Sequence, residues 1–361
     1  MELRKYKLSQ LLSIKNGKDY KHLDNGDVPV FGSGGFMCFV NSYLYDKVSI
    51  LLPRKGTLSN IQFYYNGRFW TVDTCFYSIV NESLCDPYYL YRYIKSLDLS
   101  GYDTGASIPS MTQKTYNGIK VSLPSLPTQR RIASILSAYD NLIENNNKRI
   151  WLLEQMAENL YKEWFVRFRF PGHEKVEMEN GLPKGWKVEK VQDWCRVFTG
   201  KKDVNQTVPN GKYAFFSCSP DTFKSNDYIY DGKAILVAGN GSYTGRTRYF
   251  EGKFDLYQRT YAVVSKNEDS EFLYYLYTRF KFDFEKIYSG GTRGSAIPYI
   301  VMRDLTRYRF LYEKNVVKKY TSIIRPLFRQ IDILNEEIIT LSRQRDLLLP
   351  RLMSGKLEVK V

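Results

Sequence analysis

A run of ten residues in the second half of the chain combines glycines with hydrogen-bond donors: Gly239-Asn240-Gly241-Ser242-Tyr243-Thr244-Gly245-Arg246-Thr247-Arg248. Glycines let the backbone approach a ligand closely, and Arg, Asn, Ser and Thr donate to phosphate oxygens and to base edges. The first half holds a run of the same character: Arg54-Lys55-Gly56-Thr57-Leu58-Ser59-Asn60. Two such loops favour DNA as the partner, because phosphate neutralisation supplies affinity and base edges supply specificity.

Candidate DNA contacts are chosen by residue type and by nearness to glycine-rich turns. In the first half they are Lys18, Ser33, Arg54, Lys55, Thr57, Arg68 and Thr104. In the second half they are Lys201, Lys202, Asn240, Ser242, Thr244, Arg246, Arg248 and Arg293. For any one of them, a solvated surface position is the alternative interpretation.

Two other groups carry side chains that occur in catalytic sites. Asp86-Pro87-Tyr88-Tyr89 resembles the Asp-Pro-Pro-Tyr motif of amino-methyltransferases, but the second proline is missing, and a capped helix start explains it more simply. Asp231 with Glu251-Gly252-Lys253 could form a metal-dependent nuclease site. The corresponding first-half residues, Asn66-Gly67-Arg68, have no carboxylate. The sequence therefore predicts no catalytic residues.

The sequence also predicts no metal or cofactor site. The chain has no Walker A loop, and its two histidines, His22 and His173, are far apart. Its five cysteines include no CxxC pair, which is typical of free thiols rather than a zinc site or a disulfide framework.

The composition is ordinary apart from its charge. The 361 residues are 43% hydrophobic and 25% charged, but the net charge is +15. So much positive charge usually marks a polyanionic partner, nucleic acid first and an anionic membrane second. Neither a basic amphipathic anchor nor an apolar span is found, and the first residues do not resemble a signal peptide. We expect a cytoplasmic protein that does not bind membranes.

The two halves of the chain repeat each other. Tyr45-Asp46, Ile50-Leu51, Gly56 and Gly67-x-Phe69 recur, each 185 residues later, as Tyr230-Asp231, Ile235-Leu236, Gly241 and Gly252-x-Phe254. The offset is 183 upstream, at Gly17-Lys18 and Gly200-Lys201, and 189 downstream, at Ile108-Pro109 and Ile297-Pro298. Ordered matches with a slowly drifting offset indicate a duplicated domain with small loop insertions.

Each copy ends in a long helix with a heptad pattern. The first seam consists of Ile132, Leu136, Tyr139, Ile143, Ile150, Leu153, Ala157, Leu160 and Trp164, with Asn146 as its polar member. The second consists of Ile324, Leu327, Ile331, Leu334, Ile338, Leu341, Leu348 and Leu352, with Arg345 as its polar member. Two core helices or a homodimer seam are alternatives. Pairing of the two seams within one chain is the simpler explanation.

The rest of each copy has a mixed α/β pattern, so the predicted fold class is α+β with an internal pseudo-twofold repeat. Short apolar strands are expected at 48–52 and 234–238, and packed helices at 88–94 and 272–277. The predicted domains are residues 1–125, a helix at 126–170, a second domain at 171–315 that includes an entry linker, and a helix at 316–361.

This layout resembles the specificity subunits of Type I restriction-modification systems. Leu126-Pro127-Thr128-Gln129-Arg130-Arg131-Ile132 is similar to their central conserved region, and Gly181-Leu182-Pro183-Lys184-Gly185-Trp186 to the entry of their second target-recognition domain. The second helix departs from the pattern, because Asn315-Val316-Val317-Lys318-Lys319 lacks the Pro-x-x-Gln-Arg lead.

The resemblance implies two target-recognition domains, each reading half of a split, asymmetric DNA site, with an antiparallel coiled coil as the spacer. It also implies that two methyltransferase subunits dock on the helices and that restriction subunits join them, and that these partners carry the chemistry and its cofactors. Three alternatives stay open: the specificity subunit of a Type IIB-like enzyme, a self-contained nuclease, and an RNA-binding adaptor.

Overall fold

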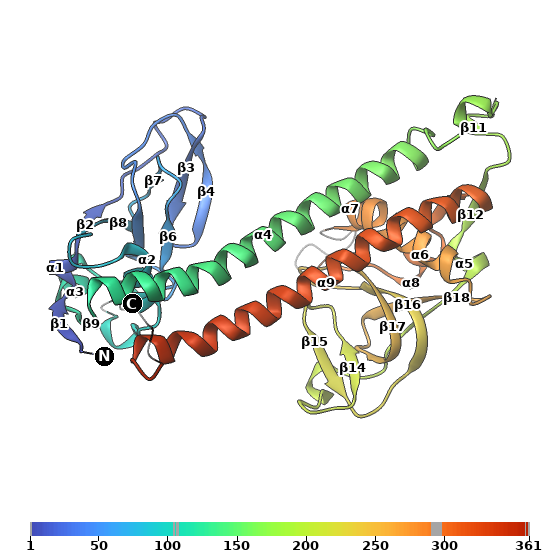
Figure 1. Cartoon of the computed structure of the whole chain (residues 1–361). Coiled ribbons are helices and arrows are strands. Elements are labelled where there is room, and N and C mark those ends of the chain that lie inside the picture. The colour runs from blue at the N-terminus through green and yellow to red at the C-terminus, as the bar shows by residue number, and fades with distance from the viewer. Residues whose placement is uncertain (1, 104, 106–107, 290–297, 358, 360–361) are drawn as a thin grey trace. The chain divides into compact units, whose positions relative to one another are not determined.

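Two helices of 40 residues, α4 (Leu126–Phe165) and α9 (Lys314–Met353), run through the computed structural model of the chain (Figure 1). The structure describes all residues except 1, 104, 106–107, 290–297, 358 and 360–361. The chain divides into two units, of which unit 1 is Met1–Asn146 with Glu336–Val361 and unit 2 is Asn147–Asn335. Each helix therefore contributes one half to each unit.

Unit 1 holds three small sheets, ordered β2-β8-β5-β6, β4-β3-β7 and β1-β9. Its elements are β1 (Arg4–Lys7), α1 (Leu8–Leu11), β2 (Leu12–Asn16), β3 (Val28–Gly32), β4 (Gly35–Val40), β5 (Ser49–Pro53), β6 (Gln62–Tyr64), β7 (Trp70–Thr71), β8 (Cys75–Val80), α2 (Pro87–Lys95), the 3-10 helix η1 (Ser100–Tyr102), α3 (Gln113–Gly118) and β9 (Lys120–Leu123). Strand β5 is buried throughout, which is why it reads as an unbroken apolar run rather than an alternating one.

Unit 2 holds a six-stranded sheet, ordered β13-β18-β16-β17-β14-β15, and the pairs β12-β19 and β10-β11. Its elements are η2 (His173–Lys175), β10 (Met178–Glu179), β11 (Leu182–Pro183), β12 (Lys187–Lys190), α5 (Val191–Trp194), β13 (Cys195–Thr199), η3 (Val204–Gln206), β14 (Tyr213–Phe216), β15 (Thr222–Ser225), β16 (Tyr230–Ala238), β17 (Thr247–Leu256), β18 (Thr260–Ser265), α6 (Ser270–Arg279), the π-helix η4 (Phe280–Phe284), α7 (Glu285–Tyr288), α8 (Met302–Thr306) and β19 (Arg309–Tyr312).

The local predictions are confirmed. The strands expected at 48–52 and 234–238 are β5 and β16, and the helices expected at 88–94 and 272–277 lie within α2 and α6. Asp86 caps α2 by accepting a hydrogen bond from the Tyr89 N–H (2.9 Å), with Pro87 at the first helical position, so Asp86 is the helix cap that the sequence suggested.

The five cysteines are free thiols. In the described part of the chain, no helix is both long and apolar enough to cross a bilayer.

The duplication extends to individual backbone hydrogen bonds. Strand pairs β1-β9, β2-β8 and β5-β8 of unit 1 correspond to β12-β19, β13-β18 and β16-β18 of unit 2, all antiparallel. The hydrogen bond from the Leu8 N–H to the Ile119 carbonyl (2.8 Å) in unit 1 corresponds to the one from the Val191 N–H to the Tyr308 carbonyl (3.1 Å) in unit 2. Likewise, the bond from the Asn81 N–H to the Leu11 carbonyl (2.8 Å) corresponds to the one from the Lys266 N–H to the Trp194 carbonyl (2.9 Å). The two copies therefore share one fold, as the sequence repeat predicted.

Each unit completes its hydrophobic core with both long helices. In unit 1 the core includes Ile132 and Leu136 from α4 together with Leu352 and Met353 from α9. In unit 2 it includes four residues of α4 and six of α9: Ala157, Tyr161, Trp164, Phe165, Val316, Val317, Tyr320, Ile324, Phe328 and Ile331. Of the predicted seam, Ile132, Leu136, Ala157, Trp164, Ile324, Ile331, Leu334 and Leu352 are buried. Half-buried are Tyr139, Ile143, Ile150, Leu153, Leu160, Leu327, Ile338, Leu341 and Leu348.

Within unit 1, two polar contacts show that the helix segments are antiparallel. The Asn146 amide donates to the Glu337 carboxylate (3.0 Å), and the Arg345 guanidinium donates to the Asp140 carboxylate (2.7 Å). From the first contact to the second, the residue number rises on α9, from 337 to 345, and falls on α4, from 146 to 140. The two helix segments therefore run in opposite directions. These contacts fix the register, because apolar side chains alone tolerate several alignments.

Asp140 also ties helix α2 of unit 1 to the two long helices. Its carboxylate accepts hydrogen bonds from Tyr88 and Arg92 of α2 as well as from Arg345. Burial alone would raise the pKa of Asp140, but the hydrogen bonds from Tyr88 and Arg345 and the charge of Arg92 outweigh it and hold that pKa below its usual value. The carboxylate is therefore ionised at neutral pH.

We predict that Asp140→Asn destabilises the protein by about 3–5 kcal/mol, because it leaves the Arg92 guanidinium, whose side chain is only 7% exposed, without its counter-charge. The matched control is Asp346→Asn. The Asp346 carboxylate also pairs with Arg345 (2.8 Å) but is 61% exposed, so its loss should cost at most about 1 kcal/mol. Urea unfolding measures both, and equal losses in the two variants would contradict the assignment.

Candidate nucleic-acid interface

The two glycine-rich runs form loops with the same backbone anchor. We call them glycine loop 1 (residues 54–60) and glycine loop 2 (residues 239–248). The Gly56 N–H donates to the Pro109 carbonyl (2.8 Å), and the Gly241 N–H donates to the Pro298 carbonyl (3.0 Å). Both glycines have positive φ, +92° and +82°, a conformation that other residues rarely adopt. The sequence repeat therefore marks a conserved loop geometry within this chain.

The anchored loops leave polar side chains at the surface. In glycine loop 1, Arg54, Lys55 and Thr57 are exposed. In glycine loop 2, Ser242 is exposed and Asn240 is half-buried. An anchored backbone with exposed donors suits hydrogen bonding to phosphates and base edges, because little ordering entropy remains to be lost on binding.

A polar brace joins each glycine loop to the neighbouring strand hairpin. In unit 1 the Asn60 and Gln62 amides donate to the carbonyls of Ser33 (2.6 Å) and Gly32 (3.0 Å), in the turn between β3 and β4. This contact places the candidate Ser33 beside glycine loop 1.

In unit 2 the brace is made by arginines. Arg246 donates to the Ser219 carbonyl (2.5 Å), and Arg248 donates to the Pro220 carbonyl (2.6 Å) and the Thr222 hydroxyl (2.8 Å), in the turn between β14 and β15. Within each unit, these contacts therefore hold the glycine loop next to a strand turn: the β3–β4 turn in unit 1 and the β14–β15 turn in unit 2.

The brace residues show what the sequence missed. Asn60 belongs to the glycine-rich run 54–60 but is not among the predicted DNA contacts, and neither is Gln62. The sequence repeat did not reveal them, because its offset of 185 residues aligns Gln62 with Thr247, whereas the strand register makes Gln62 equivalent to Arg248. Arg246 and Arg248 are predicted DNA contacts, and in the structure both hold the turn between β14 and β15.

The remaining candidates lie in several settings. Lys18, Lys201 and Arg68 are exposed, and Arg68 lies 3.5 Å from the carboxylate of Asp27. Thr104 and Arg293 lie outside the described residues.

Two candidates make internal contacts. The Lys202 ammonium bonds to the carboxylates of Asp255 (2.7 Å) and Asp227 (3.0 Å), and the hydrogen bond to Asp255 is the main reason that the pKa of Lys202 is raised. Thr244 is buried and donates to the carbonyls of Gly241 (2.7 Å) and Pro298 (2.9 Å). Both side chains therefore help to shape glycine loop 2 and the adjoining sheet.

The two halves of the chain also match one protein family. The family described as "Type I restriction modification DNA specificity domain" matches residues 2–155 and again residues 183–343. The chain belongs to this family. The resemblance drawn from the helix motif and the linker is thereby confirmed.

Individual members of the specificity family share sequence and fold with the chain. It is 27% identical over 347 residues to the Type I restriction enzyme MjaIX specificity subunit of Methanocaldococcus jannaschii, covering 88% of this chain and 79% of that protein. It is 38% identical over 125 residues to the EcoDI specificity subunit of Escherichia coli, covering 35% of this chain and 27% of that protein. The crystal structure of the Type I system S subunit from M. genitalium shares the fold, with a TM-score of 0.74 at 18% identity over 98% of this chain and 96% of that one. The predicted fold class is confirmed.

The carboxylates that could suggest a nuclease pair with lysines across two strands of the family fold. On β16 and β17, Lys253 lies 3.8 Å from Asp231 and Lys233 lies 3.7 Å from Glu251, each pair in direct register. Such cross-strand ion pairs stabilise a sheet modestly. Among the described residues, no group of three or more His, Cys, Asp or Glu side chains is arranged to hold a metal ion.

We predict that Arg248→Met loosens the turn between β14 and β15, because it removes two hydrogen bonds from a charged donor, worth about 1.5–3 kcal/mol each. Amide hydrogen exchange should become faster in residues 217–222 and stay unchanged in the turn between β3 and β4. Gln62→Met is the reciprocal variant and should affect only the first turn. Unchanged exchange at both turns would show that these contacts do not hold them.

Proposed function

We propose that this chain is the DNA-specificity subunit of a Type I restriction-modification complex, that it recognises a bipartite asymmetric site, and that it does not itself catalyse a reaction. Residues 1–125 and 171–315 act as two target-recognition domains. The helical segments 126–170 and 316–361 act as the spacer. Membership of the specificity family supports the assignment.

The observation that carries the proposal is the repeated loop anchor at Gly56 and Gly241. It provides one exposed, polar loop of the same geometry in each copy of the fold. The side chains differ: the first loop has a lysine, one arginine and one threonine, whereas the second has no lysine, two arginines and two threonines. Equal geometry with different donors suits the reading of two different half-sites.

The spacer has a suitable length. A 40-residue helix is about 60 Å long, and half-sites on one face of a duplex are about 34 Å apart. Two domains carried by such helices can therefore reach two half-sites separated by one helical turn. The net charge of +15 supports binding to the phosphate backbone between them.

We further propose that two methyltransferase subunits dock on the helical segments and that restriction subunits join the complex through them. Two related domains and two antiparallel helix segments offer two equivalent docking positions. The partners supply S-adenosylmethionine binding, ATP hydrolysis and DNA cleavage, so this chain needs no cofactor of its own.

We predict that co-expression with the cognate methyltransferase subunits produces N6-methyladenine at one split motif, and only when this chain is present. Replacing residues 1–125 with the equivalent domain of another specificity subunit should change one half of the motif and leave the other half unchanged. Replacing residues 171–315 is the reciprocal control. Single-molecule sequencing of host DNA reads both halves, and methylation that is independent of the chain would refute the proposal.

A further inference from the structure

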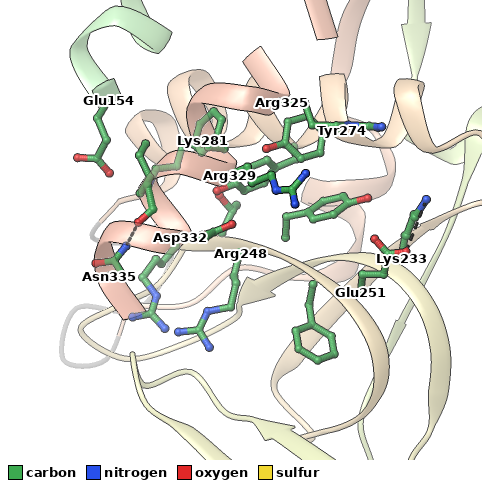
Figure 2. A pocket seen from close by; sticks show the side chains of 17 residues that line it. Glu154, Lys233, Arg248, Glu251, Tyr274, Lys281, Arg325, Arg329, Asp332 and Asn335 are labelled. Atoms are coloured by element: carbon green, nitrogen blue, oxygen red, sulfur yellow. Dashed lines mark hydrogen bonds and ion pairs between the residues drawn. The ribbon is translucent and has the colours of Figure 1, made fainter. Parts of the chain in front are cut away.

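Unit 2 contains an open cavity of about 550 Å³ between the recognition sheet and the helices (Figure 2). Strand β17 forms one wall, α6 and η4 form a second, and α9 forms a third, with Glu154 of α4 at the margin. The cavity is within the size range of ligand sites. Its cationic lining residues are Lys233, Arg246, Arg248, Lys281, Arg325 and Arg329, and its acidic ones are Glu154, Glu251 and Asp332.

Six cationic and three acidic side chains line this cavity, so positive charge is in excess there. Among the described residues, Lys233 pairs with Glu251 at 3.7 Å. Arg246 and Arg248 donate to backbone carbonyls and a hydroxyl, which do not neutralise them. Burial, and secondly the nearby charge of Arg246, lower the pKa of Arg248. An anion in the cavity would relieve this repulsion.

Helix α9 contributes two of the cations that line the cavity, Arg325 and Arg329. Arg325 is held in place, because it donates to the Ser270 carbonyl (3.1 Å) and its guanidinium lies over the Tyr274 ring (5.1 Å). Figure 2 shows Arg325 next to Tyr274 at the cavity wall. Arg329 follows four residues later, on the same helix face, and is exposed. Lys281 of η4 lines the same space.

The chemistry of the lining suits a phosphodiester. Guanidinium groups bind phosphate through paired, charge-assisted hydrogen bonds. The aromatic residues Tyr249, Phe250, Tyr274, Tyr277 and Phe328 also line the cavity and offer apolar surface for a sugar or base. The cavity is continuous with glycine loop 2, because Arg246 and Arg248 belong to that loop and line the cavity as well.

We propose that this cavity binds a backbone phosphate of the DNA held by unit 2, which makes α9 a DNA-contacting element in addition to a spacer. The proposal rests on the proposed function, since it needs a bound duplex. The contact is independent of sequence: it adds affinity and positions the recognition domain, while the glycine loops choose the bases.

The test measures how the binding constant of the full-length chain for duplex DNA of arbitrary sequence depends on salt. Fluorescence anisotropy reports binding at salt concentrations between about 50 and 200 mM. Arg329→Gln and Lys281→Gln should each lower the slope of log K against log salt by about 0.9, the value for one lost phosphate contact. The double variant should lower it by about twice that amount. Arg343→Gln removes the same charge from an exposed position of α9 that does not line the cavity, and should leave the slope unchanged.

The outcomes separate the two proposals. Wild-type binding to duplex DNA, with equal slopes for the Arg329 and Arg343 variants, would overturn the cavity contact and leave the proposed function intact. No duplex binding by the wild-type chain would overturn both. Adenosine 5′-monophosphate is the probe for a free nucleotide. If it binds the wild-type chain and not Arg329→Gln, while the DNA slope is unchanged, the cavity takes a free nucleotide and the DNA contact is wrong.

Discussion

The structure depends on the sharing of both long helices by both units. Unit 1 includes Leu352 and Met353 from the end of the chain in its core, and unit 2 includes Trp164 and Phe165 from the end of the first repeat. Neither copy of the duplicated fold can therefore bury its apolar surface with its own segment alone. The ion pair between Asp140 and Arg345, which are 205 residues apart, adds a specific polar contact to this long-range pairing. Folding must bring the C-terminal turns of α9 to the first half of the chain before the core of unit 1 is complete.

This constraint explains why the copies keep one backbone and differ in side chains. The anchors of Gly56 and Gly241 preserve the loop geometry, while the braces changed from the amides of Asn60 and Gln62 to the guanidiniums of Arg246 and Arg248. An amide and a guanidinium can hold the same turn, because both donate to its carbonyls. The guanidinium also carries a positive charge, so the electrostatic potential at the brace of unit 2 differs from that at the brace of unit 1. A difference of this kind changes the donors that a loop presents without changing the scaffold that positions it.

The sequence predicted the elements better than their contacts. Repeat offsets, heptad spacing and the Asp-Pro start of a helix are local or periodic signals, so they located both helices, the duplicated strands and the capping role of Asp86. Partners that are distant in sequence leave no such pattern. Arg345 was recognised as the polar member of its seam, but its partner Asp140 was not. Lys202 was chosen by its type, although two carboxylates from other strands and turns bind it. The cations of α9 were missed because the sequence does not show which face of a helix borders a cavity.

The central claim is that two copies of one fold read two separate parts of one DNA site. Hydroxyl-radical footprinting tests it most directly, with the full-length chain and its methyltransferase partners on a duplex that carries the methylated motif. The account predicts two protected blocks of similar length, about one helical turn apart from centre to centre, with a less protected spacer between them. A single continuous block centred on one half of the motif would contradict it.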